Sequence, residues 1–246
     1  MLKRIPLAFV AIVLACLAMP AQARVVTLVA TEWIPFTGDT LPGKGFLTEI
    51  TLEALRRAGH EPQLTFAPWK RALEMARAGE VDGLIGASYA EERTGDFVYP
   101  RYFRPSALYF FTRASNNVVY TRPEALCPAV LGLLRGSFLE ERFKSVPCLQ
   151  IDLAAEVEQN LRKLSAGRLD YILESRDAVL FLLAGPLRDV RNLKPVEPPY
   201  EIDKVYTVFS RKKADADALA AAFDAGVDQL EADGSCAAIL QRYGLR

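Results

Sequence analysis

The chain has 246 residues, of which 51% are hydrophobic, and its 30 basic residues balance its 30 acidic ones to a formal net charge of zero. This balance argues against the basic surface that nucleic-acid binding requires. The length allows one large domain or two modest ones, each with its own core.

The first residues have the pattern of a secretory signal peptide. Lys3 and Arg4 precede an apolar run from Ile5 to Met19, and Ala21-Gln22-Ala23 supplies the small-x-small pattern that a signal peptidase recognises. The run is too short to span a bilayer comfortably. We therefore expect residues 1–23 to be removed as a signal peptide and the rest of the chain to lie in the periplasm.

A lipid anchor at Cys16 is the alternative to plain cleavage. Val13-Leu14-Ala15-Cys16 is a loose version of a lipoprotein processing site, but Leu14 fits that site poorly, so we favour cleavage after Ala23. Cleavage removes two basic residues and no acid, which leaves 223 of the 246 residues with 28 basic and 30 acidic side chains and a net charge of −2.

Strands and helices alternate in the first third of the mature chain. Val25 to Ala30 is a β-branched apolar run typical of a buried parallel strand, and Pro35 ends its ladder. The next helix places Leu47, Ile50, Ala54 and Ala58 on one face and ends at Gly59. A second helix runs from Pro68 to Gly79, and Val81 to Ile85 is predicted as the following strand.

The remainder of the chain continues this alternation. Val130 to Leu134 and Val205 to Phe209 are predicted strands. Amphipathic helices are predicted from three sets of apolar residues: Val157, Leu161 and Leu164; Leu219, Ala222, Phe223, Val227 and Leu230; and Ala238, Ile239 and Tyr243. No low-complexity linker separates these elements, which favours lobes joined by strand-like crossovers.

An internal echo suggests that two lobes are built alike. The segment Ala78-Gly79-Glu80-Val81-Asp82-Gly83-Leu84-Ile85 is repeated loosely as Ala166-Gly167-Arg168-Leu169-Asp170-Tyr171-Ile172-Leu173. Each copy follows a helical stretch, and a buried strand precedes each. An echo of eight residues can arise by chance, but it predicts two similar α/β lobes.

The cysteines predict a disulfide rather than a metal site. Cys16 lies in the signal segment, which leaves Cys127, Cys148 and Cys236 in an oxidising compartment. A Cys127–Cys148 bridge closing a short loop is our prediction, although three cysteines allow other pairings. The chain has no CxxC spacing and one histidine, His60, so a zinc site is not expected.

Ligands of open α/β sheets bind outside the carboxyl ends of the strands. Here those ends are residues 33–36, 86–93, 136–140 and 174–177. If the two lobes face each other, all four segments line one cleft that can close by a hinge.

The order of short motifs resembles that of the bacterial extracellular solute-binding proteins of family 3, the receptors of polar amino-acid ABC importers. The motifs are Glu32-Trp33-Ile34-Pro35-Phe36, Gly45-Phe46, Pro68-Trp69, Ala78-Gly79, Ser88 to Arg93 with Asp96-Phe97, Arg135-Gly136-Ser137, Ala166-Gly167-Arg168-Leu169-Asp170, Ala232-Asp233-Gly234 and Tyr243-Gly244. Each motif is weak alone, but together they cover nearly the whole mature chain.

This resemblance implies an α/β fold of the type II periplasmic binding class, with two similar lobes of mixed, mostly parallel sheets joined by a two-strand hinge. Residues 24–112 and 206–246 are expected to form the first lobe and residues 113–205 the second. The hinge is expected near residues 112–115 and 203–206. We expect a monomer with no cofactor and no metal.

The resemblance also implies site residues. Arg93 matches the arginine that grips the ligand carboxylate, for which a planar guanidinium is suited; the alternative is a surface arginine paired with Glu91 or Glu92. Trp33 matches a stacking aromatic, and Phe36 and Trp69 match positions near the same wall, with packing as their alternative role. Ser137 and, more weakly, Ser88 match hydroxyl positions, with helix capping as the alternative for Ser137.

One departure from the family pattern bears on specificity. Ser175 stands where amino-acid receptors have an aspartate for the ligand ammonium, and the nearby acids Glu174 and Asp177 would reach it only in a shifted register. We place Glu174 in the site, but the ligand could also lack an ammonium group.

Three functions follow from this reading. The first is a periplasmic protein that captures a small carboxylate-bearing polar ligand, an amino acid or a relative, and delivers it to ABC importer subunits. The second is a periplasmic cyclohexadienyl or arogenate dehydratase on the same fold, with Glu174 or Glu140 as the acid or base. The third is a ligand sensor that acts on a membrane receptor. We favour the first and expect no enzymatic activity, because no Ser/His/Asp or Cys/His set is present.

Overall fold

A computed structural model of the chain describes residues 23–102 and 104–245, and the signal segment with Cys16 lies outside this part. The ten strands it contains are β1 (Val25–Ala30), β2 (Glu61–Phe66), β3 (Gly83–Ser88), β4 (Phe97–Val98), β5 (Arg104–Arg113), β6 (Ala129–Leu134), β7 (Leu149–Ala154), β8 (Tyr171–Ser175), β9 (Leu193–Pro195) and β10 (Glu201–Ser210).

The α-helices lie between these strands and at the end of the chain. They are α2 (Phe46–Arg57), α3 (Trp69–Ala78), α4 (Phe138–Phe143), α5 (Val157–Ser165), α6 (Arg176–Ala184), α7 (Ala216–Ala232) and α8 (Ser235–Arg242). Short 3₁₀ turns are η1 (Pro42–Lys44), η2 (Glu91–Arg93) and η3 (Pro123–Leu126). None of the helices in the described ranges is long and apolar enough to cross a bilayer.

The strands form two similar sets that share a central antiparallel pair. The strand order is β2-β1-β3-β10-β5-β8-β6-β7, in which β1 pairs in parallel with β2 and β3, and β6 pairs in parallel with β7 and β8. The echo at Ala78–Ile85 and Ala166–Leu173 corresponds to α3 entering β3 and α5 entering β8. The prediction of two α/β lobes built alike is therefore confirmed.

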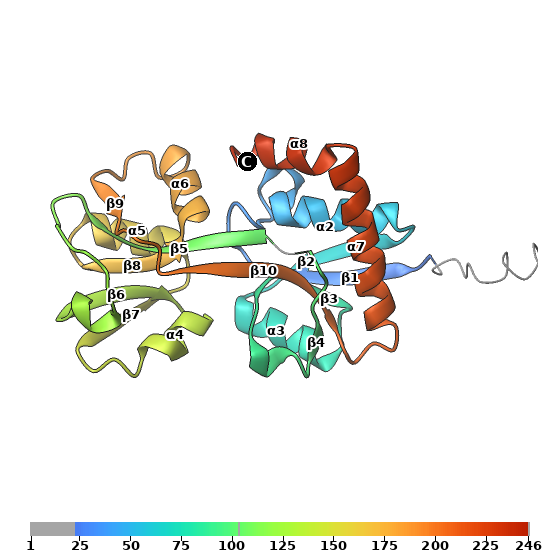
Figure 1. Cartoon of the computed structure of the whole chain (residues 1–246), viewed down its shortest axis with the longest axis horizontal. Helices are drawn as coiled ribbons and strands as arrows, with labels where there is room; N and C mark the ends of the chain where they lie inside the picture. Colours follow the sequence, from blue (N-terminus) through green and yellow to red (C-terminus); the bar gives the residue numbers. More distant parts are fainter. Residues whose placement is uncertain (1–22, 103, 246) are drawn as a thin grey trace, which may run out of the picture.

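We define the first lobe as β1–β4 with α2, α3, α7 and α8, and the second lobe as β6–β9 with α4, α5 and α6. Figure 1 shows β10 and β5 running between the two lobes. They pair with each other over Glu201–Val205 and Arg104–Leu108. The predicted hinge residues 203–206 overlap this crossing, whereas residues 112–115 lie further along, where β5 already pairs with β9. The residue boundaries of the lobes stay a prediction.

Each lobe has apolar clusters of its own because helices cover both faces of its strands. In the first lobe, Phe46, Ile50 and Phe223 lie in the cluster under α2, α7 and α8, while Leu73 lies under α3. Two apolar contacts cross between the lobes: Ile34 packs against the cluster of the second lobe, and Phe181 of α6 packs against that of the first. The lobes therefore touch on the side of Ile34 and α6.

The predicted disulfide is present. Cys127 and Cys148 are bonded across a sequence separation of 21, where they tie the chain just before β6 to the start of β7. Cys236 is a buried free thiol. No group of three or more potential metal ligands occurs among the described residues.

Candidate ligand-binding cleft

A cavity of about 610 Å³ lies between the lobes at the carboxyl ends of their parallel strands. The segments after β1, β3 and β6 and the last residues of β8 contribute to its wall, as the strand-end rule predicts. Of the predicted site residues, Trp33, Trp69, Ser88, Arg93, Ser137 and Glu174 line it. Its charged lining residues are Glu32, Lys70, Arg93, Arg135, Glu156, Glu174 and Asp203.

Arg93 is a buried cation that forms no ion pair with a carboxylate of the described residues. It lies in η2 just after β3 and is 8% exposed. Its Nη1 has no hydrogen-bond partner among the described residues, and no ion pair joins it to Glu91 or Glu92. Its guanidinium carbon lies 5.5 Å from the centroid of the Trp69 ring, which provides a cation–π contact. The alternative of a surface ion pair is therefore wrong.

Trp33 and Glu174 make a polar contact between the lobes. The indole Nε1 of Trp33 donates a hydrogen bond of 3.2 Å to Oε1 of Glu174, which also accepts 2.7 Å from the backbone N–H of Ser175. Phe36 is fully buried outside the cavity wall and stacks on Trp33, with 4.1 Å between ring centroids. Phe36 therefore supports the Trp33 ring from behind, and we withdraw its predicted ligand contact.

Glu174 has an unusual protonation equilibrium. Burial raises the pKa of its carboxyl to about 7, although the hydrogen bonds from Ser175 and Trp33 favour the ionised form, and Glu158 raises it further. None of the cations in the described part of the chain forms an ion pair with Glu174 that would offset this burial. Burial therefore favours the neutral form of Glu174 more than in an exposed glutamate.

The residue at the family's aspartate position does not reach the cleft. Ser175 is fully buried, caps α6 by accepting from the N–H of Ala178, and shares a hydrogen bond of 3.0 Å with Ser106. Asp177 is not part of the cavity wall either. Glu174 alone of the three lines the cavity, one residue before the expected position.

A second buried carboxyl in the cleft was missed from sequence. Asp203 of β10 is 6% exposed, lines the cavity and accepts a hydrogen bond of 2.6 Å from the Ser88 hydroxyl. Burial raises the pKa of Asp203 to about 6 against the lowering effect of that hydrogen bond. Side chains alternate between the two faces of a strand, so Asp203 lies on the same face as the core residue Val205, two positions later. This rule could have placed Asp203 on the inner face from sequence. No motif in the neighbouring sequence marks Asp203 as a residue of the cleft.

Ser137 and Gly136 complete the wall on the side of the second lobe. Ser137 is the N-cap residue of α4, but its buried hydroxyl makes no capping hydrogen bond and has no hydrogen-bond partner in the described ranges. Gly136 has a φ of 74° and approaches Trp69, since a Cβ added there would lie 3.7 Å from the indole Cδ1. Arg93 of the first lobe and Ser137 of the second, each with a polar atom that lacks a hydrogen-bond partner among the described residues, thus line one cavity.

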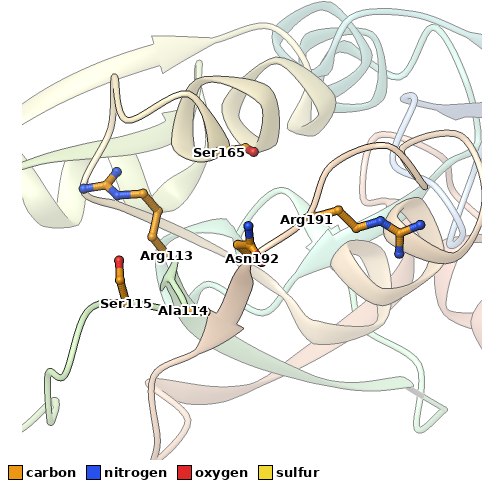
Figure 2. A pocket seen from close by; sticks show the side chains of 6 residues that line it. All are labelled: Arg113, Ala114, Ser115, Ser165, Arg191 and Asn192. Atoms are coloured by element: carbon orange, nitrogen blue, oxygen red, sulfur yellow. The ribbon is translucent and has the colours of Figure 1, made fainter.

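A smaller cavity of about 400 Å³ lies beside the end of α5 and lacks these features. Figure 2 shows its lining side chains, with Arg113 and Arg191 pointing away from each other. The Arg113 guanidinium already donates to the carbonyls of Leu164 and Leu169, and Arg191 is exposed. The cleft between the lobes is therefore the candidate site.

Comparisons with known proteins agree with this architecture. The family model of the bacterial extracellular solute-binding proteins, family 3, matches residues 25–246. No curated protein sequence matches the chain.

Solved structures with the same fold include a sensor domain, a ligand-binding core and a transporter substrate-binding protein. A histidine kinase sensor domain similar to periplasmic binding proteins has a TM-score of 0.77 at 20% identity and covers 90% of this chain and 96% of its own. The GluR0 ligand-binding core from Nostoc punctiforme in complex with L-glutamate has a TM-score of 0.75 at 14% identity, and the match covers 89% of this chain and 98% of that chain. An amino-acid ABC transporter substrate-binding protein from Streptococcus pneumoniae bound to L-arginine has a TM-score of 0.73 at 18% identity. That match covers 92% of this chain and 96% of that chain.

Proposed function

The chain belongs to the bacterial extracellular solute-binding proteins of family 3, and from this premise we propose that it captures a small amino acid or a relative by its carboxylate. The observation that carries this proposal is the buried, unpaired guanidinium of Arg93 in the cleft. Burying a charge without a partner costs several kcal/mol, and truncating one member of a buried pair costs ~3–5 kcal/mol. A ligand carboxylate is the bidentate partner that a guanidinium fits best.

The ligand's second anchor is the wall formed by Trp33 and Glu174. An ammonium group beside the ionised carboxyl of Glu174 would offset its burial, and the Trp33 ring offers a flat apolar surface and a cation–π contact. The hydroxyl of Ser137 is free to donate to the ligand carboxylate from the second lobe. The proposed ligand is therefore a zwitterion held by both lobes.

Contacts from both lobes make closure of the cleft depend on the ligand. A ligand that touches Arg93 of the first lobe and Ser137 of the second binds fully only in the closed arrangement, so it shifts the population toward that state. We propose that the protein acts in the periplasm after removal of residues 1–23 and that ABC importer subunits receive the closed form. A membrane receptor is the alternative partner, because the fold is also similar to that of a histidine kinase sensor domain.

Substitution of Arg93 tests the proposal. Protein freed of ligand by unfolding and refolding should show a rise in melting temperature with at least one amino acid, opine or small organic acid. Arg93→Ala should weaken that ligand on the order of 100-fold or more in calorimetry, as expected for loss of one partner of a buried charge pair. Arg191→Ala is the control, because Arg191 is exposed and lies in the smaller cavity. Unchanged affinity in Arg93→Ala would contradict the carboxylate anchor.

The raised pKa of Glu174 favours one second candidate, a dehydratase that uses this carboxyl as a general acid or base. Glu140, the other acid considered, accepts a hydrogen bond from the N–H of Gly136 and is not part of the cavity wall. Incubation with prephenate or arogenate separates the two functions. A binding protein leaves both compounds unchanged, whereas formation of product would replace capture by catalysis.

A further inference from the structure

We propose that Ile34 and Phe181 hold the two lobes together outside the ligand cavity and thereby raise the affinity for any ligand that both lobes contact. We call these two side chains the interlobe clasp. The inference goes beyond the proposed function, because it concerns contacts that the protein makes with itself and residues that do not touch the ligand.

The clasp is reciprocal, since each lobe packs one apolar side chain against the core of the other. Ile34, in the segment after β1, packs against the second-lobe cluster that contains Val179 and Leu182 of α6. Phe181 of the same helix packs against the first-lobe cluster that contains Phe46. Figure 1 shows α6 on the same side of the crossing strands β5 and β10 as α2 and α8. The helix α6 is therefore the part of the second lobe that the first lobe holds.

The clasp lies outside the cavity but belongs to the same arrangement of the lobes as the polar contact in the cleft. Neither Ile34 nor Phe181 is part of the cavity wall. Ile34 directly follows Trp33, whose indole donates to Glu174 across the cleft. The clasp and this hydrogen bond join protein groups only, so neither requires a ligand. Both form when the lobes approach each other.

The clasp is displaced from the strands that act as the hinge. In the sheet, β3 lies between β1 and the crossing strand β10. The end of β1, which leads into Ile34, is thus two strand spacings, or ~10 Å, from β10. A rotation about the β5–β10 pair that widens the cleft separates Trp33 from Glu174, and it also separates the neighbouring Ile34 from α6. Opening the cleft therefore breaks the clasp.

Breaking the clasp exposes apolar surface to water. Ile34 and Phe181 are both partly buried, and transfer of their buried surface to water is unfavourable. The clasp thus increases the closed fraction of the ligand-free protein, and a ligand shifts the remainder. Since the apparent Kd is the intrinsic Kd divided by the closed fraction, the clasp raises affinity without a ligand contact.

Phe181→Ala tests the clasp in ligand-free protein. Small-angle scattering should give a larger radius of gyration than for the wild type. In a Trp69→Phe background, acrylamide should quench the fluorescence of Trp33 more strongly, because the indole loses its contact with the second lobe. Leu180→Ala is the matched control and should change neither quantity, because Leu180 is the preceding residue of α6 and is 47% exposed. Ile34→Val removes one methyl group from the other side of the clasp and should give a smaller change in the same direction.

Calorimetry measures the consequence for affinity, with L-arginine, L-glutamate and each further amino acid that raises the melting temperature as probes. Phe181→Ala should weaken every amino acid that binds by about fivefold or more, and by the same factor, because the closed fraction scales all affinities alike. Leu180→Ala should change them by less than about twofold. With saturating ligand, the radius of gyration of Phe181→Ala should equal that of the wild type. Damage to the cavity would instead alter the preference among amino acids.

The measurements on ligand-free protein decide the inference separately from the proposed function. Circular dichroism and melting establish that each variant is folded, and Ile34→Val decides alone if Phe181→Ala does not fold. An unchanged radius of gyration and unchanged quenching in the clasp variants, or tighter binding by them, would overturn the clasp. Affinity that is insensitive to Arg93→Ala would instead remove carboxylate capture and leave the clasp standing.

Discussion

Glu174 makes the stability of the ligand-free protein depend on pH. Its folded pKa is about 7, above the value of ~4.3 for an unperturbed glutamate. Between these two values the unfolded chain has lost the proton that the folded protein retains. Stability from this group is therefore present below pH ~4.3 and is lost as the pH rises to about 7.

Glu174→Gln should remove the loss of folding stability that accompanies ionisation of Glu174 at rising pH. At pH 8 we expect the ligand-free variant to be more stable than the wild type, by up to about 3 kcal/mol, because the neutral amide has no charge to bury. Near pH 4.5 the two proteins should melt at similar temperatures. The measurement is thermal unfolding of ligand-free protein at both pH values, with Glu80→Gln as an exposed control. A variant that is no more stable at pH 8 would refute the buried, unpaired state of Glu174.

At the scale of elements, the first lobe depends on close contact between two helices. Gly226 of α7 lies against the backbone of α2, and a Cβ added there would lie 2.0 Å from the carbonyl oxygen of Ala54. The two helices approach each other over this glycine because it has no side chain. This contact holds α7 on the lobe that carries Arg93.

Gly226→Ala should therefore destabilise the protein. The helices would have to separate, and overpacking of this kind costs ~1–3 kcal/mol or more. Gly95→Ala is the matched control, because nothing lies within 4 Å of a Cβ at Gly95. Differential scanning calorimetry should show a lower melting temperature for the first variant alone. Equal melting temperatures would mean that α7 can shift without loss.

At the scale of the whole molecule, the proposed closure brings the two walls of one cleft together around a ligand. Trp33 and Trp69 are the two tryptophans of the chain, and both line that cleft from the first lobe. Trp33 contacts Glu174 of the second lobe, and Trp69 lies beside Gly136. Intrinsic fluorescence therefore reports on the cleft directly.

Ligand should change the tryptophan emission and reduce the radius of gyration. Both changes follow from closure, because each indole exchanges water for ligand and protein while the lobes approach. Fluorescence titration with Trp33→Phe and Trp69→Phe assigns the signal, and small-angle scattering measures the compaction. Arg93→Ala, which should not bind, is the control. Ligand binding in calorimetry with no change in scattering would contradict hinge closure.

The sequence by itself determined several of the elements and the outline of the cleft, whereas strands such as β5 were not predicted. Runs such as Val25–Ala30 predict strands because a short, continuous run of apolar and β-branched residues is typical of a buried parallel strand. The echo at Ala166 predicts the second copy of the lobe. The same local reasoning places Arg93 and Ser137 after strands, where the ends of a parallel sheet meet. The Cys127–Cys148 pair was predicted among several possible pairings of three cysteines, and the structure contains it.

Only the tertiary structure decided which polar side chains share one environment. Phe36 and Trp33 are three residues apart, yet one is fully buried and the other lines the cavity. Ser175 caps a helix while its neighbour Glu174 faces Trp33 from the opposite lobe. Asp203 becomes a site residue through Ser88, which lies 115 positions away in the chain. Burial and charge pairing depend on contacts between distant segments, and the pattern of neighbouring residues does not encode those contacts.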